Sequence, residues 1–121
     1  MIVVVTGGRD YPNTPRLFSV LDEIHVDTPI SLIRNGGMTG ADALSSRWAY
    51  SRKVDTECFG ALWGQFGSGA GPERNVRMLR ALPVAGLVVA FFDRPEVESR
   101  GTAHCCRAAE QHGIPVRRVL P

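Results

Sequence analysis

The sequence lacks a strong net charge and lacks a hydrophobic run of membrane-spanning length. Its 14 lysines and arginines stand against 12 acidic residues, which gives a formal net charge of +2 over 121 residues. Without a basic run the chain has little with which to follow a phosphate backbone, so single-stranded nucleic acid is a disfavoured partner. The apolar start at residues 1–6 is too short for a membrane span or a signal peptide. We therefore expect no membrane partner.

Cysteine and lysine are scarce. The three cysteines, Cys58, Cys105 and Cys106, are odd in number and form no CxxC motif, which is typical of a reducing, cytoplasmic setting. Cys105 and Cys106 would point about 100° apart on a helix, and no second ligand pair has zinc spacing, so we expect no metal site and no cofactor. Lys53 is the one lysine among the 14 basic residues. The arginine bias is compatible with an anionic ligand, although genomic base composition explains most of it.

Strand-like and helix-like patterns alternate along the chain. Apolar or β-branched runs predict strands at residues 1–5, 30–33, 56–59, 84–92 and 116–120. Helical spacing of apolar residues predicts helices at residues 15–26, 41–53, 72–82 and 101–112, with a long glycine-rich loop at 60–71. This alternation is typical of a parallel sheet with helices on both faces. We expect one α/β domain over residues 1–121, a three-layer Rossmann-like fold with five parallel strands in the order 3-2-1-4-5.

Glycine-bearing turns follow four of the predicted strands. They lie at residues 6–10, 35–42, 67–75 and 99–102. In a parallel sheet all four turns meet at the carboxyl edge, where open α/β folds bind ligands because backbone N–H groups and helix N-termini converge there. Glycine also lets a backbone approach an oxygen-rich group closely. The pattern predicts a phosphate or nucleotide site.

The first two turns each allow two interpretations. Gly7 and Gly8 form either an anion nest or a tight turn, and Arg9 adds a cation beside them. Neither a dinucleotide fingerprint after the first strand nor a Walker A motif is present. In the second turn, Thr39 and Asp42 resemble a capping box, and the glycines before them would leave free N–H groups for a phosphate or ribose; these are Gly36 and Gly37.

The third and fourth turns contain the candidate charges. With Pro72 as the first helical residue, Arg74 would lie in the first turn against the helix dipole, which favours a ligand contact for its side chain. Asn75 would hydrogen-bond a base, a sugar or a neighbouring loop. In the fourth turn Thr102 offers a hydroxyl beside free N–H groups, while Ser99 would cap the helix.

Other side chains leave the chemistry open. Asp93 ends the fourth strand and could accept a proton or a ribose hydroxyl, or do neither. Trp63 and Phe66 in the loop at 60–71 would either stack on a base or pack over the sheet edge. Met78 lies four residues after Arg74, and core packing is its favoured role.

The chain resembles the SLOG superfamily of Rossmann-like domains, which includes the Lonely Guy phosphoribohydrolases and DprA/Smf. It is most similar to the small YspA-like branch of bacteria and phages. The resemblance spans nearly the whole chain. It rests on the segments Val5-Thr6-Gly7-Gly8-Arg9-Asp10-Tyr11, Gly36-Gly37 with Gly40-Ala41-Asp42, Trp48-Ala49, Trp63, Gly67, Ala70-Gly71-Pro72, Arg74-Asn75, Met78 and Arg100-Gly101-Thr102.

The resemblance implies an activity as well as a ligand. In Lonely Guy enzymes an arginine and a glutamate break the N-glycosidic bond of a nucleoside monophosphate. Arg74 and Met78 match the first half of that motif, whereas Cys105 stands at the position of the glutamate. Asp93 is the candidate carboxylate in its place. Relatives in the superfamily commonly dimerise, so the resemblance also implies a homo-oligomer.

We therefore expect a module that binds a nucleotide-like small molecule at the carboxyl edge of the sheet, as a sensor or sequestering protein. The expected ligand-binding residues are Thr6, Gly7, Gly8, Arg9, Gly36, Gly37, Asp42, Arg74, Asn75, Arg100, Gly101 and Thr102. One alternative is a phosphoribohydrolase in which Arg74 and Asp93 are catalytic. A second alternative is single-stranded nucleic-acid binding.

Overall fold

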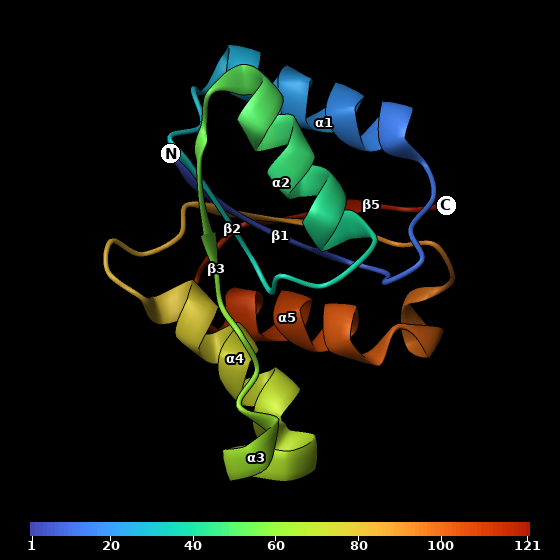
Figure 1. Cartoon of the computed structure of the whole chain (residues 1–121), viewed down its shortest axis with the longest axis vertical. Helices are drawn as coiled ribbons and strands as arrows, with labels where there is room; N and C mark the ends of the chain where they lie inside the picture. The colour runs from blue at the N-terminus through green and yellow to red at the C-terminus, as the bar shows by residue number, and fades with distance from the viewer.

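The computed structural model describes all residues from 1 to 121. Strands and helices alternate along the chain as the pattern predicts, and Figure 1 shows them in three layers. The strands are β1 (Ile2–Gly7), β2 (Leu32–Asn35), β3 (Asp55–Cys58), β4 (Leu87–Phe91) and β5 (Val116–Val119). The helices are α1 (Thr14–Asp27), α2 (Ala41–Arg52), α3 (Trp63–Phe66), α4 (Ala70–Arg80) and α5 (Arg100–Gln111), with short 3-10 turns η1 (Gly67–Gly69) and η2 (Glu96–Glu98).

The five strands form one parallel sheet in the order β3-β2-β1-β4-β5. The predicted fold class and strand order are therefore confirmed. Helices α1 and α2 cover one face of the sheet, and α4 and α5 cover the other (Figure 1). Because every strand runs in the same direction, the chain leaves the sheet at the same edge after each strand.

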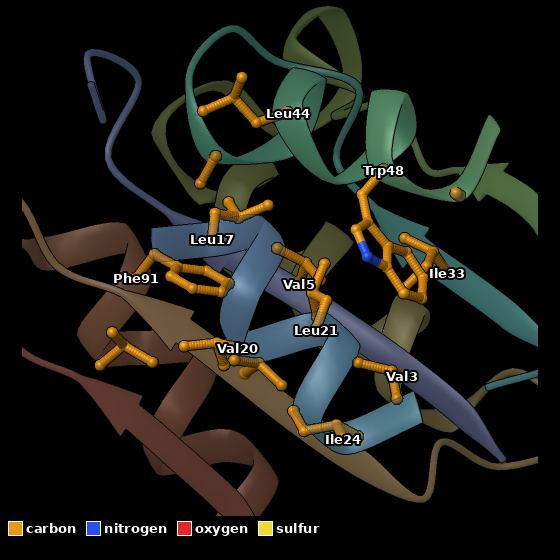
Figure 2. Packing of buried hydrophobic residues seen from close by; sticks show 14 of the residues in the cluster. Val3, Val5, Leu17, Val20, Leu21, Ile24, Ile33, Leu44, Trp48 and Phe91 are labelled. Atoms are coloured by element: carbon orange, nitrogen blue, oxygen red, sulfur yellow. The ribbon is translucent and has the colours of Figure 1, made fainter. Parts of the chain in front are cut away.

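The central strand β1 shows why the sequence favours this arrangement. Val3 and Val5 pack with α1 and α2 in one hydrophobic cluster, while Val4 packs with α4 and α5 in another. Figure 2 shows the first cluster, in which Trp48 of α2 and Phe91 of β4 lie beside the valines. A strand covered on both faces needs apolar residues at every position, which explains the uninterrupted valine run.

The region between β3 and α4 differs from the prediction. Residues 63–66 of the expected loop form the short helix α3, and α4 begins at Ala70 with Gly69 as its N-cap. Pro72 is therefore the third residue of α4 rather than the first. Arg74 lies one turn inside the helix, so the expected clash with the helix dipole is wrong.

No helix in the chain combines the length and the hydropathy that crossing a bilayer requires.

Candidate functional site

A cavity of about 580 Å³ opens at the carboxyl edge of the sheet. Its wall includes the end of β1, the segment that follows β4, the start of α4 and the first turn of α5. Nearly all of the predicted site residues line it. They are Thr6, Gly7, Gly8, Arg9, Asp42, Arg74, Asn75, Asp93, Arg100, Gly101 and Thr102, whereas Gly36 and Gly37 do not line it.

Close packing accounts for Gly7 of the first turn, and a side chain lies beside Gly8. A Cβ on Gly7 would lie 2.6 Å from the Ala41 Cβ and from the Phe91 carbonyl oxygen. A Cβ on Gly8 would lie 2.6 Å from the Asp93 carboxylate. The N–H of Gly8 donates to the Phe91 carbonyl at 3.2 Å. The Gly8 N–H is therefore used within the protein, although both glycines border the cavity.

The second turn is held together by its own polar side chains. The Asp42 Oδ2 accepts hydrogen bonds from the N–H groups of Gly36 at 3.1 Å and Met38 at 3.2 Å. The N–H of Gly37 donates to the Asn35 Oδ1 at 2.9 Å. These N–H groups are engaged within the protein, so the expectation that Gly36 and Gly37 leave them free is wrong.

The expected capping box at α2 is also absent. Gly40 is the N-cap of α2, and no side chain caps the helix. The Thr39 hydroxyl instead donates to the carbonyl of Arg9 at 3.0 Å, which joins the first two turns. Asp42 holds the preceding turn rather than the start of its own helix.

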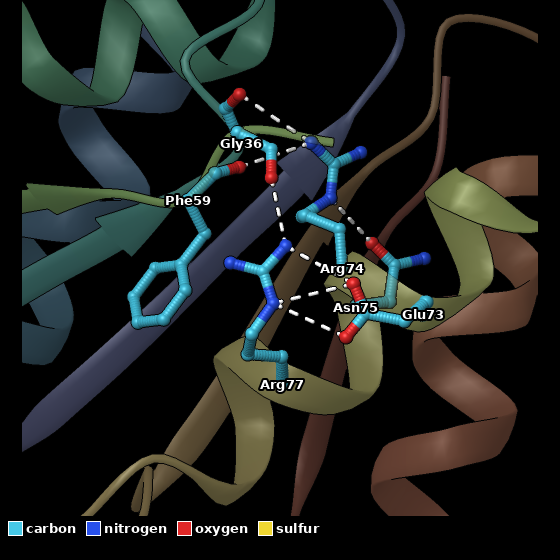
Figure 3. Close-up of polar contacts among 7 residues, drawn as sticks. Gly36, Phe59, Glu73, Arg74, Asn75 and Arg77 are labelled. Carbon is cyan, nitrogen blue, oxygen red and sulfur yellow. Dashed lines mark hydrogen bonds and ion pairs between the residues drawn. The ribbon is translucent and has the colours of Figure 1, made fainter. Parts of the chain in front are cut away.

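Arg74 reaches from α4 to the ends of β2 and β3 (Figure 3). Its Nη1 donates to the carbonyl oxygens of Gly36 at 3.4 Å and Phe59 at 3.3 Å, and its Nε donates to the Asn75 Oδ1 at 3.1 Å. Nη2 forms no hydrogen bond within the protein. The guanidinium is thus fixed on one side and retains two N–H donors at the cavity wall.

Asn75 connects Arg74 to the start of α5. The side chain is 4% exposed, and its Nδ2 lies 3.3 Å from the Gly101 carbonyl oxygen and 3.3 Å from the His104 Nδ1. Since the amide nitrogen donates, we assign the acceptor role to the His104 Nδ1, which places the ring proton on Nε2. Burial, with a smaller effect of Arg107, lowers the pKa of His104 and favours this neutral ring. His104 lines the cavity, a position that the sequence pattern did not predict.

The first turn of α5 has no side-chain cap. Ser99 is the N-cap residue, but its hydroxyl donates to the Pro95 carbonyl at 3.1 Å, so the expected cap by Ser99 is wrong. The N–H groups of the first three residues of α5 have no partner in the protein; these residues are Arg100, Gly101 and Thr102. A Cβ on Gly101 would meet nothing within 4 Å, so the fold itself does not require glycine there.

Two carboxylates line the cavity together with the arginines, those of Asp42 and Asp93. Burial raises the pKa of Asp42, an effect that the N–H of Met38 and the charge of Arg74 oppose. Oδ1 of Asp42 forms no hydrogen bond within the protein. The Asp93 Oδ1 lies 3.4 Å from the Arg94 Nε. Both carboxylates can accept a hydrogen bond from a hydroxyl group of a ligand.

Cys105 is fully buried and does not line the cavity. Burial is the main cause that raises the pKa of its thiol to about 12. The position at which the resemblance to Lonely Guy enzymes implies a glutamate therefore contains a buried, neutral thiol. Met78 is 2% exposed and packs in the core, as predicted.

No cluster of three or more His, Cys, Asp or Glu side chains could hold a metal ion.

Comparison with known proteins gives two matches. A family model described as the YspA, cpYpsA-related SLOG family matches residues 1–66. The chain is also similar to the Gene 61 protein of Mycobacterium phage D29, with 36% identity over 120 residues that cover 94% of this chain and 92% of that protein. No solved structure matches the chain significantly.

Proposed function

This chain belongs to the YspA, cpYpsA-related SLOG family, and on that premise we propose that it binds a nucleotide or nucleotide-derived ligand at the carboxyl edge of its sheet. The protein would act as a sensor or as a sequestering module. The phosphate would lie at the start of α5, and the sugar would lie near the carboxylates.

The observation that supports this proposal best is the meeting of unpaired donors in one cavity. The N–H groups of Arg100, Gly101 and Thr102 have no partner, and Nη2 of Arg74 has none either. A helix N-terminus and a guanidinium both favour an anion, and together they suit the oxygens of a phosphate group. Gly101, which has open space around its Cα, would let those oxygens approach the backbone.

The charges around the cavity favour a small ligand over a polyanion. The cavity is lined by four arginines, which are Arg9, Arg74, Arg94 and Arg100. It is also lined by four acidic residues, which are Asp10, Asp42, Asp93 and Glu98. A nucleic-acid strand would meet repulsion from the carboxylates as well as attraction from the arginines. A nucleotide can satisfy both kinds of group, since its phosphate accepts hydrogen bonds and its ribose hydroxyls donate them.

Isothermal titration calorimetry with matched pairs of ligands tests the proposal. Each ribonucleoside is compared with its 5′-monophosphate at fixed ionic strength. We expect at least one monophosphate to bind about 10-fold or more tightly than its nucleoside, because hydrogen bonds to charged groups are the stronger ones. Equal affinity within every pair, or no binding of any monophosphate, would contradict the proposal.

The same samples test the hydrolase alternative. Chromatography of each monophosphate after incubation with the protein would reveal released base. Cys105 is buried away from the cavity, and Asp93, the candidate carboxylate in its place, pairs with Arg94 at 3.4 Å, so we expect binding without release. Release that is lost in Arg74→Ala would instead make the protein a phosphoribohydrolase.

A further inference from the structure

Trp63 is exposed at the wall of the polar cavity. Its side chain is 51% exposed, and it begins α3, the short helix that projects from the body of the molecule in Figure 1. The indole N–H forms no hydrogen bond, and no other aromatic ring contacts it. The outer edge of the ring, at Cη2, lies 3.9 Å from where a Cβ on Gly71 would stand.

The indole ring of the other tryptophan, Trp48, has both a hydrogen-bond partner and packing partners. Trp48 is fully buried, its indole N–H donates to the Asp22 Oδ1 at 2.9 Å, and its ring packs edge-on against His25. Trp63 has none of these contacts. An aromatic side chain that is half exposed at a cavity wall gains free energy when a ligand buries its surface.

The cavity indicates what covers it. Trp63 is the largest of the three apolar side chains that line the cavity, and the other two are Met38 and Pro72. Phe66 and Leu62 are also exposed near α3, but neither lines the cavity. Glycines follow Trp63 closely, and a Cβ on Gly64 or Gly67 would meet nothing within 4 Å, so the fold leaves the surroundings of α3 open.

We propose that Trp63 stacks on the base of the bound nucleotide. This inference rests on the proposed function and narrows it: the ligand carries an intact planar base, and a sugar phosphate is an incomplete ligand. Stacking on an aromatic side chain accepts any base, because every base has a flat π-face. The backbone and arginine donors at α5 and α4 hold the phosphate, and Trp63 holds the other end of the ligand.

Calorimetry with two probes separates stacking from phosphate binding. The probes are ribose 5-phosphate and the tightest binder among the four ribonucleoside 5′-monophosphates. In Trp63→Ala we expect affinity for the monophosphate to fall about 10-fold or more, with affinity for ribose 5-phosphate unchanged. Trp63→Phe should retain most of the affinity, and Phe66→Ala is the matched control because Phe66 is exposed on the same helix and lies off the cavity.

Fluorescence gives a second readout. The monophosphate should quench tryptophan emission in the wild type and leave it unchanged in Trp63→Phe, in which the buried Trp48 is the remaining emitter. Ribose 5-phosphate should quench neither protein.

The possible failures can be told apart. If the wild type binds neither probe, the proposed function fails and the stacking fails with it. If the wild type binds both probes and Trp63→Ala weakens them equally or not at all, the stacking alone fails. Light scattering distinguishes a third outcome. If Trp63→Ala and Phe66→Ala both convert an oligomer into a monomer, and neither selectively loses monophosphate binding, the aromatic residues of α3 contact a second protein chain. That result would overturn the stacking proposal.

Discussion

The guanidinium of Arg74 occupies the space that a Cβ on Gly36 would fill, and its Nη1 donates to the Gly36 carbonyl at 3.4 Å. The absence of a side chain at Gly36 therefore makes room for the Arg74 guanidinium, and Gly36 does not bind a ligand directly. A glycine that lies outside the cavity in this way sets the position of a charge inside it.

Gly36→Ala should weaken monophosphate binding more than it weakens the fold. The new Cβ displaces the far end of a flexible side chain, so we expect a loss of only about 1 kcal/mol in the free energy of unfolding. Affinity should fall about 10-fold, since the Arg74 guanidinium leaves the position that the two carbonyls define. Urea denaturation and calorimetry measure the two effects. Gly69→Ala is the control, because a Cβ there meets nothing within 4 Å; an affinity loss in the control equal to that in Gly36→Ala would contradict this prediction.

Arg74→Ala should lower affinity for a monophosphate about 10-fold or more, by removal of a charged hydrogen-bond donor from the cavity. Arg77 provides the matched control, since it lies one turn further along α4, away from the cavity, and pairs with Glu73 at 3.1 Å. Arg77→Ala should bind the monophosphate as tightly as the wild type does. Equal losses in the two variants would show that the effect is not specific to the cavity.

His104 should make the fold less stable in mild acid. Burial lowers its pKa in the folded protein, so the unfolded chain takes up a proton first as the pH falls. The contribution of His104 to the free energy of unfolding is complete above the ordinary histidine pKa of about 6.5. It is lost as the pH falls from there through the lower pKa of the folded state. Protonation of the His104 Nδ1 also turns this atom into a donor, which then faces a second donor, the Asn75 Nδ2.

Unfolding by urea between pH 8 and pH 5 measures this effect. The free energy of unfolding of the wild type should decline more steeply than that of His104→Gln. Parallel declines would mean that His104 keeps its ordinary pKa in the folded state.

The three cysteines should differ in reactivity. Burial raises the pKa of Cys105 to about 12 and that of Cys106 to about 11, and both side chains are fully buried, whereas Cys58 is exposed. Because the thiolate is the reactive form, iodoacetamide at pH 8 should label Cys58 alone in the native protein and all three cysteines in urea. Mass spectrometry of digested protein identifies the labelled sites, and rapid native labelling of Cys105 would contradict its placement behind the cavity wall.

The sequence pattern predicted the fold well because the strongest signals came from burial. The run Val3-Val4-Val5 is typical of a strand covered on both faces, and the alternation of strands and helices is typical of a parallel sheet. The position of the cavity followed from the direction of the strands.

Details of the turns were harder to predict, because one polar side chain can satisfy several backbone groups. Asp42 was expected to cap α2, yet it accepts from the N–H groups of Gly36 and Met38. The start of α4 was placed too late, since Pro72 is tolerated anywhere in the first turn, where its missing N–H costs nothing. His104 was missed because its importance depends on Asn75, a contact between two helices that sequence spacing does not reveal.

The most direct test of the central claim is Gly101→Ala. Position 101 is helical and exposed, and a Cβ there meets nothing within 4 Å, so alanine should leave the fold intact and raise the free energy of unfolding by about 0.5–1 kcal/mol. The methyl group would stand where the phosphate approaches the unpaired N–H groups of α5, so affinity for the tightest-binding ribonucleoside 5′-monophosphate should fall about 10-fold or more. A more stable protein that binds this monophosphate weakly is the predicted result. A stable Gly101→Ala protein that binds it as tightly as the wild type would contradict a phosphate site at the start of α5.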